Sequence, residues 1–166
     1  MIEAIKKPDS HHLLAAQGWL ELGNLPEAAH ELEQINTAWQ EHPEVLEIRW
    51  QIHARSKSWD ECVRVAAAMI RANPTSAVGW IHRSYALHEL QRTAEARDGL
   101  LSVVKLFPDE LTILYNLACY ECTLGNLPKA REWLEKIFST TQGDEWRATA
   151  LEDLDLKPLW PIIAKL

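Results

Sequence analysis

The chain has 166 residues, of which 47% are hydrophobic and 25% charged, and it carries a formal net charge of −7. This composition supplies enough apolar side chains for a buried core and excludes a disordered chain. Nucleic acid is not an expected partner, because no Lys/Arg cluster is longer than Lys6-Lys7 and a duplex binder needs a basic face against the phosphates.

The cysteines and the apolar segments indicate the cellular compartment of the protein. Cys62, Cys119 and Cys122 are too few for a disulfide framework, and their odd number fits a reducing compartment. The N-terminus lacks the apolar run of a secretory signal, and no stretch approaches the roughly 18 apolar residues of a membrane span. We therefore expect a cytoplasmic protein with no membrane segment.

The main feature of the sequence is a repeat at a spacing of 34 residues. Small residues recur at this spacing, namely Ala28, Cys62, Ala96 and Ala130. The positions four and seven residues later are also apolar or small: Leu32, Ala66, Leu100 and Leu134, then Ile35, Met69, Val103 and Ile137. Offsets of 0, 4 and 7 lie on one face of a helix. The upstream half of each copy shows similar spacing, so each copy is predicted to form two amphipathic helices.

Residues 1–8 are predicted to be an N-terminal tail, and the first copy covers residues 9–42. Its helices meet at a Gly-Asn-Leu-Pro turn at 23–26. Gly23 can end one helix in the left-handed conformation, Asn24 can cap the next, and Pro26 fits the first helical turn. Because Pro43 falls just after the expected end of this copy, its second helix is predicted to run longer than the others.

The second copy covers residues 43–76 and the third covers residues 77–110. Each ends at a proline-containing turn, Asn-Pro-Thr-Ser at 73–76 and Phe-Pro-Asp-Glu at 107–110. Proline disfavours the helical conformation in the residue before it, so a helix is predicted to stop at each turn. Ser76 and Asp109 are the candidate caps of the helices that follow.

The fourth copy covers residues 111–142 and repeats the Gly-Asn-Leu-Pro turn at 125–128. Residues 143–166 depart from the repeat and are predicted to form a C-terminal capping helix and tail, since the last helix pair would otherwise expose its apolar face. Asp144 is the candidate N-cap of this helix. Ile162, Ile163 and Leu166 are expected to fold back against it.

This pattern resembles the tetratricopeptide repeat (TPR) family, whose unit reads W-x2-L-G-x2-Y, then A-x3-F, then P. The third copy is the nearest match, with Trp80, Ser84, Leu87, Ala96, Leu100 and Pro108. The resemblance covers about residues 9–142. It implies an all-α fold, an α-α superhelix in which antiparallel helix pairs form a right-handed solenoid.

By the same resemblance, the first helix of each copy lines a concave groove that holds a peptide or helix of a partner protein. The register places these residues there: Gln17, Glu47, Gln51, Arg55, Ile81, His82, Tyr85, His88, Tyr115, Asn116 and Cys119. Tyr85 and Tyr115 are candidate anchors, because aromatic side chains give much contact area for little entropy. Packing between copies is the alternative role for both.

The leading hypothesis is a protein-interaction module, such as an adaptor, scaffold or assembly factor, with no catalytic residue, metal or cofactor. One alternative is a small acidic secretion chaperone for a specific client protein. Another is a metal or redox site at Cys119 and Cys122, with His82 and His88 nearby, although a C-x-x-C in mid-helix favours packing. Exposed apolar surface also leaves a homodimer open.

Overall fold

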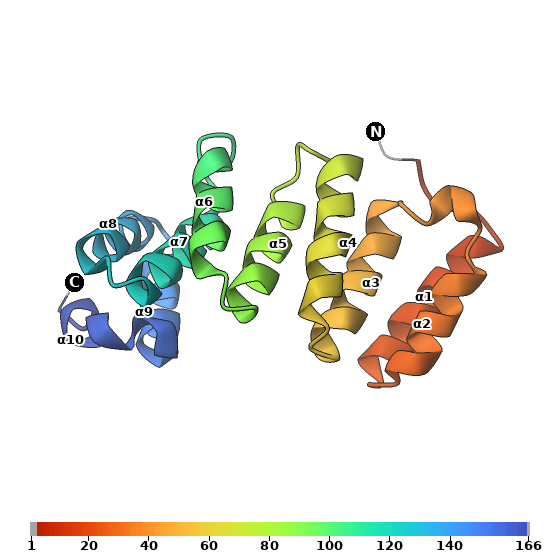
Figure 1. The fold of residues 1–166 in the computed structure, drawn as a ribbon, viewed down its shortest axis with the longest axis horizontal. Coiled ribbons are helices and arrows are strands. Elements are labelled where there is room, and N and C mark those ends of the chain that lie inside the picture. The colour runs from red at the N-terminus through yellow and green to blue at the C-terminus, as the bar shows by residue number, and fades with distance from the viewer. Residues whose placement is uncertain (1–2, 166) are drawn as a thin grey trace. The chain divides into compact units, whose positions relative to one another are not determined.

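The computed structural model describes residues 3–165, and that range contains helices and loops but no β-strand. The all-α class predicted from the sequence is therefore confirmed. Contacts divide the chain into two compact units, Met1–Ala86 and Leu87–Leu166, which we call unit 1 and unit 2. Each is described by itself below, with the helix labels of Figure 1. No helix within the described range is long and apolar enough to span a bilayer.

Unit 1 is built from helix pairs. It contains α1 (Asp9–Glu21), α2 (Leu25–Gln34), the short 3-10 helix η1 (Thr37–Trp39), α3 (Pro43–Arg55), α4 (Trp59–Ala72) and most of α5 (Val78–Glu89). The helices of the α1–α2 and α3–α4 pairs pack against each other, and α3 also contacts α1 and α2. Tight turns within the pairs make the paired helices antiparallel.

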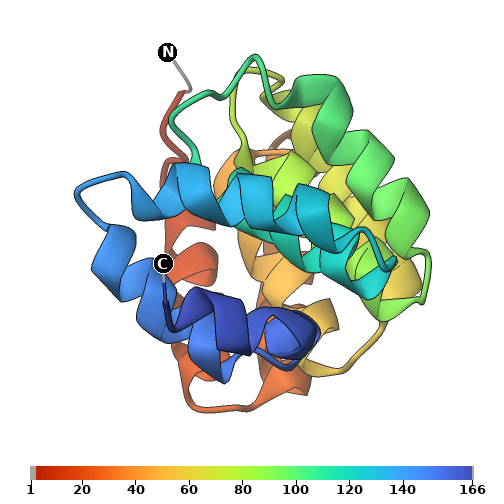
Figure 2. The ribbon, with the colours of Figure 1, turned by 90° about the vertical axis from the view of Figure 1, so that its left-hand side faces the viewer.

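Unit 2 combines a further helix pair with a C-terminal segment. It contains α6 (Thr93–Val103), α7 (Leu111–Thr123), α8 (Leu127–Phe138), α9 (Gly143–Glu152), the 3-10 helix η2 (Leu154–Leu159) and α10 (Trp160–Ile163). α7 packs against α8 and α6, while η2 contacts α7 as well as α9 and α10. Figure 2 shows α10 close to α9 at the end of the chain.

The turns within the pairs share one backbone conformation. Gly23, Lys57, Gln91 and Gly125 all have positive φ values, of 78°, 56°, 62° and 83°. They lie 34 residues apart. In each turn the next residue donates its backbone N–H to the carbonyl five positions back, as Asn24 does to Trp19 at 2.9 Å. This is the Schellman arrangement that ends a helix, and it recurs even where the residue is not glycine.

The small residues of the repeat lie at the centres of these packings. Ala28, Cys62, Ala96 and Ala130 are all 0% exposed. A small side chain at each position lets the neighbouring helix approach closely. The leucines four residues later in the third and fourth copies, Leu100 and Leu134, are also 0% exposed. Burying a leucine side chain contributes about 1.5–3 kcal/mol relative to leaving it in water.

The two Gly-Asn-Leu-Pro turns differ in their caps. The Asn24 side chain accepts a hydrogen bond from the Glu27 backbone N–H at 3.3 Å, as predicted. Asn126 makes no such cap; its side-chain amide instead donates to Oε2 of Glu121 at 2.7 Å. Glu121 is 5% exposed, and a buried carboxylate requires donors. Asn126 therefore occupies the N-cap position of α8, as predicted, but its side chain does not cap the helix.

The caps between copies also differ from one another. Ser76 Oγ accepts from the Val78 backbone N–H at 3.3 Å, in agreement with the prediction. At the start of α7, however, the N-cap is Glu110, whose carboxylate accepts from the Thr112 N–H at 3.2 Å. Asp109 lies one residue too early to reach that N–H, so its predicted role is not observed.

Two helix boundaries differ from the predicted ones. α2 ends at Gln34 rather than running toward Pro43, which instead occupies the first turn of α3. Asp144 lies inside the first turn of α9 and the N-cap is Gln142, so the predicted cap is displaced by two residues. Ile163 is fully buried, as expected for a residue folded back on the cap. Leu166 lies outside the described residues.

Candidate functional site

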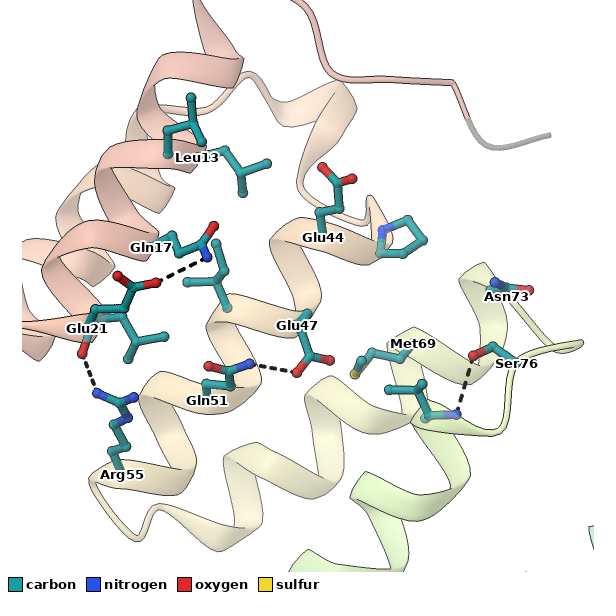
Figure 3. A pocket seen from close by; sticks show the side chains of 16 residues that line it. Leu13, Gln17, Glu21, Glu44, Glu47, Gln51, Arg55, Met69, Asn73 and Ser76 are labelled. Carbon is teal, nitrogen blue, oxygen red and sulfur yellow. Dashed lines mark hydrogen bonds between the residues drawn. The ribbon is translucent and has the colours of Figure 1, made fainter. Parts of the chain in front are cut away.

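Unit 1 contains a groove of about 640 Å³ (Figure 3). Its side chains come from α1, from α3, and from the end of α4 and the start of α5. We call it the unit-1 groove. Its lining residues are Leu13, Leu14, Gln17, Leu20, Glu21, Pro43, Glu44, Glu47, Ile48, Gln51, Arg55, Met69, Asn73, Ser76, Val78 and Gly79.

Apolar side chains from several helices meet in the unit-1 groove. Leu20 and Ile48 are buried, whereas Val78 is 43% and Leu14 66% exposed. When a partner buries exposed apolar surface of this kind, the free energy of binding becomes more favourable by about 25 cal/mol per Å². Such a surface is typical of a binding site.

Acidic side chains surround these apolar residues. Glu21, Glu44 and Glu47 line the groove, and Arg55 is the one cationic residue among the lining residues listed above. Arg55 donates a hydrogen bond through Nη1 to the Leu20 carbonyl near the C-terminal end of α1 (Figure 3). A cation at a helix C-terminus is favourable. The guanidinium therefore serves the fold, and the groove carries a net negative charge.

Glu47 is held in place by two neighbours. Gln51 Nε2 donates to one carboxylate oxygen at 2.8 Å, and His82 Nε2 lies 3.0 Å from the other. The His82 ring stacks on Trp50, with ring centroids 3.8 Å apart. The hydrogen bond with His82 holds the pKa of Glu47 below its ordinary value, although burial acts in the opposite direction. Glu47 is therefore an oriented, ionised carboxylate at neutral pH.

The predicted residues of α5 lie outside the groove lining. His82 reaches the groove only through Glu47, and Ile81 is half-buried. Tyr85 is 42% exposed, and its ring packs edge-on against Trp50 and Trp59, at centroid distances of 6.3 and 5.7 Å. Tyr85 thus combines the two roles that the sequence left open, since one part of its ring packs and the rest faces solvent.

The C-terminal segment covers the corresponding face of unit 2. Tyr115 is only 7% exposed, and its hydroxyl donates to Oδ2 of Asp153 at 2.8 Å. Cys119 Sγ lies 3.5 Å from the same oxygen, and the Tyr115 ring packs on Trp146. The sequence left open whether Tyr115 is a groove anchor or packs between copies. In the structure the C-terminal segment covers it, because η2 packs on α7.

His88 is part of the same covered face. Its Nε2 lies 3.1 Å from Oδ2 of Asp155 and its Nδ1 lies 3.0 Å from Oγ1 of Thr93. Its ring lies against Tyr120. Asn116 is half-buried on α7. The unit-1 groove thus brings together four of the eleven predicted residues, Gln17, Glu47, Gln51 and Arg55.

The C-x-x-C pair lies inside α7, where Cys119 is 5% and Cys122 is 4% exposed. Burial raises the pKa of both thiols, and the carboxylates of Asp153 and Asp155 raise it further. A protonated thiol is a poor nucleophile and a poor metal ligand. Among residues 3–165, no group of three or more His, Cys, Asp or Glu side chains is arranged to hold a metal ion.

The sequence did not predict that the end of α4, the turn before α5 and the start of α5 also line the groove. Four residues from this region line the groove: Met69 on α4, Asn73 and Ser76 between the helices, and Gly79 on α5. Gly79 permits close packing, since a Cβ there would lie 2.9 Å from atoms of Ile70 on α4. The Asn-Pro-Thr-Ser motif at 73–76 was the available signal, and only a helix end and the Ser76 cap were predicted from it.

No protein-family model and no curated protein matches the chain. It is similar to solved structures of MamA, which are TPR-like helical solenoids. A double mutant of MamA RS-1 aligns with a TM-score of 0.69 and 15% identity, covering 80% of this chain and 75% of that chain. A MamA point mutant aligns at 0.61 with 19% identity over 75% and 73%. MamA MSR-1 aligns at 0.60 with 20% identity over 75% and 76%. The chain therefore has an all-α, TPR-like solenoid fold.

Proposed function

We propose that this protein is an interaction module that binds a segment of another protein in the unit-1 groove and catalyses no reaction. The observation that carries the proposal is the groove itself, where Leu14 and Val78 expose apolar surface beside oriented polar groups such as Glu47. Concave apolar surfaces with a few fixed polar groups are typical binding sites. An adaptor, scaffold or assembly factor requires such a surface.

We also infer that the chain is a divergent TPR protein with four repeats, at 9–42, 43–76, 77–110 and 111–142, followed by a capping segment at 143–166. The four left-handed turns and the four buried small residues support this inference, since both recur every 34 residues. The cytoplasmic location and the homodimer remain predictions from the sequence.

The proposal is tested by capturing partners from a native lysate with the full chain and two variants. Leu14→Glu places a charge on the exposed apolar part of the groove, where the native side chain is 66% exposed and the fold should tolerate the change. Leu106→Glu is the matched control, since Leu106 is 70% exposed and lies outside the groove. A partner lost with Leu14→Glu and kept with Leu106→Glu supports the proposal. A partner kept by both folded variants contradicts it.

A further inference from the structure

The geometry of the unit-1 groove points to one class of occupant: we propose a cationic amphipathic segment of a partner protein. Its apolar side chains contact the leucine-rich surface, and its Lys or Arg side chains meet the acidic residues. This inference rests on the proposed function and specifies the chemistry of the partner.

The first argument is the charge that the groove presents. Glu21 and Glu44 are exposed, and the Glu47 side chain is 34% exposed. The amides of Gln17 and Gln51 orient Glu21 and Glu47 without cancelling their charge. Complementary charges raise association rates and select among partners, so this groove favours cations and disfavours acidic segments.

The second argument comes from the equivalent face of unit 2, where the occupant is visible. Tyr115 and Cys119 lie two 34-residue intervals after Glu47 and Gln51. The Tyr115 hydroxyl is a donor, and the chain covers it with the acidic residue Asp153. In unit 1 the same register position holds the acceptor Glu47. By analogy with this pair, a cationic donor on the partner would complement the charge of Glu47, whose two oxygens already contact Gln51 and His82.

The covering segment of unit 2 also shows that charge and apolar contact occur together. Leu156, one residue after Asp155, is 0% exposed, and Leu159 is 1% exposed. Charged residues on this segment thus accompany apolar residues that bury themselves. The unit-1 groove offers the same combination, with Leu13 and Ile48 beside Glu44 and Glu47. Its volume of about 640 Å³ suits a few side chains of one helix face.

The test uses three synthetic peptides of about 18 residues, which share leucines at i, i+3, i+4 and i+7 and carry Lys, Gln or Glu at the other positions. Binding to the full chain is measured by fluorescence anisotropy at two salt concentrations. We expect the Lys peptide to bind roughly tenfold more tightly than the Gln peptide, with the difference shrinking at high salt. The Glu peptide should bind least.

Two double variants separate a specific site from general attraction to an acidic protein. Glu21→Gln with Glu44→Gln removes two charges from the groove, whereas Glu33→Gln with Glu152→Gln removes two exposed charges elsewhere. The groove variant should weaken Lys-peptide binding by about fivefold, since each exposed ion pair contributes only modestly to binding. The control variant should leave binding within about twofold of the unmodified chain.

Three results would overturn the inference. Equal binding of the Lys and Gln peptides, lost for both with Leu14→Glu, leaves the proposed function standing but removes the cationic requirement. Equal weakening by the two double variants shows attraction to the whole protein rather than to the groove. Absence of binding by all three peptides also overturns it, while the proposed function is judged by the capture experiment.

Discussion

The Tyr115 hydroxyl donates a 2.8 Å hydrogen bond to Oδ2 of Asp153, joining the middle of α7 to a segment 38 residues later in the chain. The other oxygen of the same carboxylate accepts from the Asp155 backbone N–H at 3.0 Å and so caps η2. One side chain thus both starts η2 and attaches it to α7. This contact explains why a face that the repeat pattern marks as open is covered.

Tyr115→Phe should destabilise the protein by about 1–2 kcal/mol, because the half-buried Asp153 loses a donor while the aromatic ring stays in place. Urea unfolding of the full chain measures the effect. The same change made in an Asp153→Asn background should cost less, and the difference gives the coupling energy of the pair. Identical costs in the two backgrounds would show that the hydrogen bond does not hold the segment.

Lys57→Gly and Gln91→Gly should each stabilise the protein by about 0.5–1 kcal/mol, because these residues adopt positive φ values at which glycine has no Cβ penalty. Thermal unfolding measures the gain. Gly23→Ala is the reciprocal change and should destabilise by a similar amount through backbone conformation alone, since a Cβ there meets no atom within 4 Å. A loss of stability in Lys57→Gly and Gln91→Gly would contradict this account.

Gly143→Ala should destabilise the protein by about 1–3 kcal/mol, because the added Cβ would lie 2.2 Å from the Phe138 carbonyl oxygen and the backbone must move. Gly18→Ala is the matched control. Gly18 lies inside α1, where a Cβ meets nothing within 4 Å, so alanine should stabilise by up to about 1 kcal/mol. Chemical denaturation of both variants should give changes of opposite sign, and equal changes would refute the steric argument.

The contribution of Glu47 to the free energy of unfolding should decrease as the pH falls. Its pKa in the folded protein is lowered from the ordinary 4.5, so its contribution is present above that value and is lost as the pH falls through the folded pKa. Glu47→Gln keeps the side-chain shape and removes this dependence. The difference in unfolding free energy between the two proteins should be larger at pH 5 than at pH 3. A constant difference would mean that the Glu47 charge plays no part in stability.

The sequence predicted the repeating core well, because each column of the repeat encodes one packing position. Ala28 and Ala130 are fully buried for the reason the spacing suggested. The contact between Tyr115 and Asp153 could not be predicted, since it joins a repeat residue to a segment outside the periodicity. The side chain of the N-cap residue Asn126 makes no cap hydrogen bond for a related reason, because its amide donates to the buried carboxylate of Glu121 instead.

The candidate site was predicted only in part. The register grouped Gln17 and Gln51, and both line the unit-1 groove from equivalent positions on α1 and α3, while partner binding there stays a prediction. It could not show that Met69 on α4 and Asn73 at the end of α4 join them, since this depends on how α4 packs beside α3. Nor could it show that His82 turns to Glu47 and stacks on Trp50.

The left-handed turns have a consequence for how such proteins diverge. Two of the four positions dispense with glycine and still keep the bend. The penalty of about 1–2 kcal/mol for each is no larger than the gain from one well-buried leucine. Selection for folding alone therefore does not preserve the turn glycines of the motif. Relationships among such chains will be recognised from the positive φ values of the turns more readily than from residue identity.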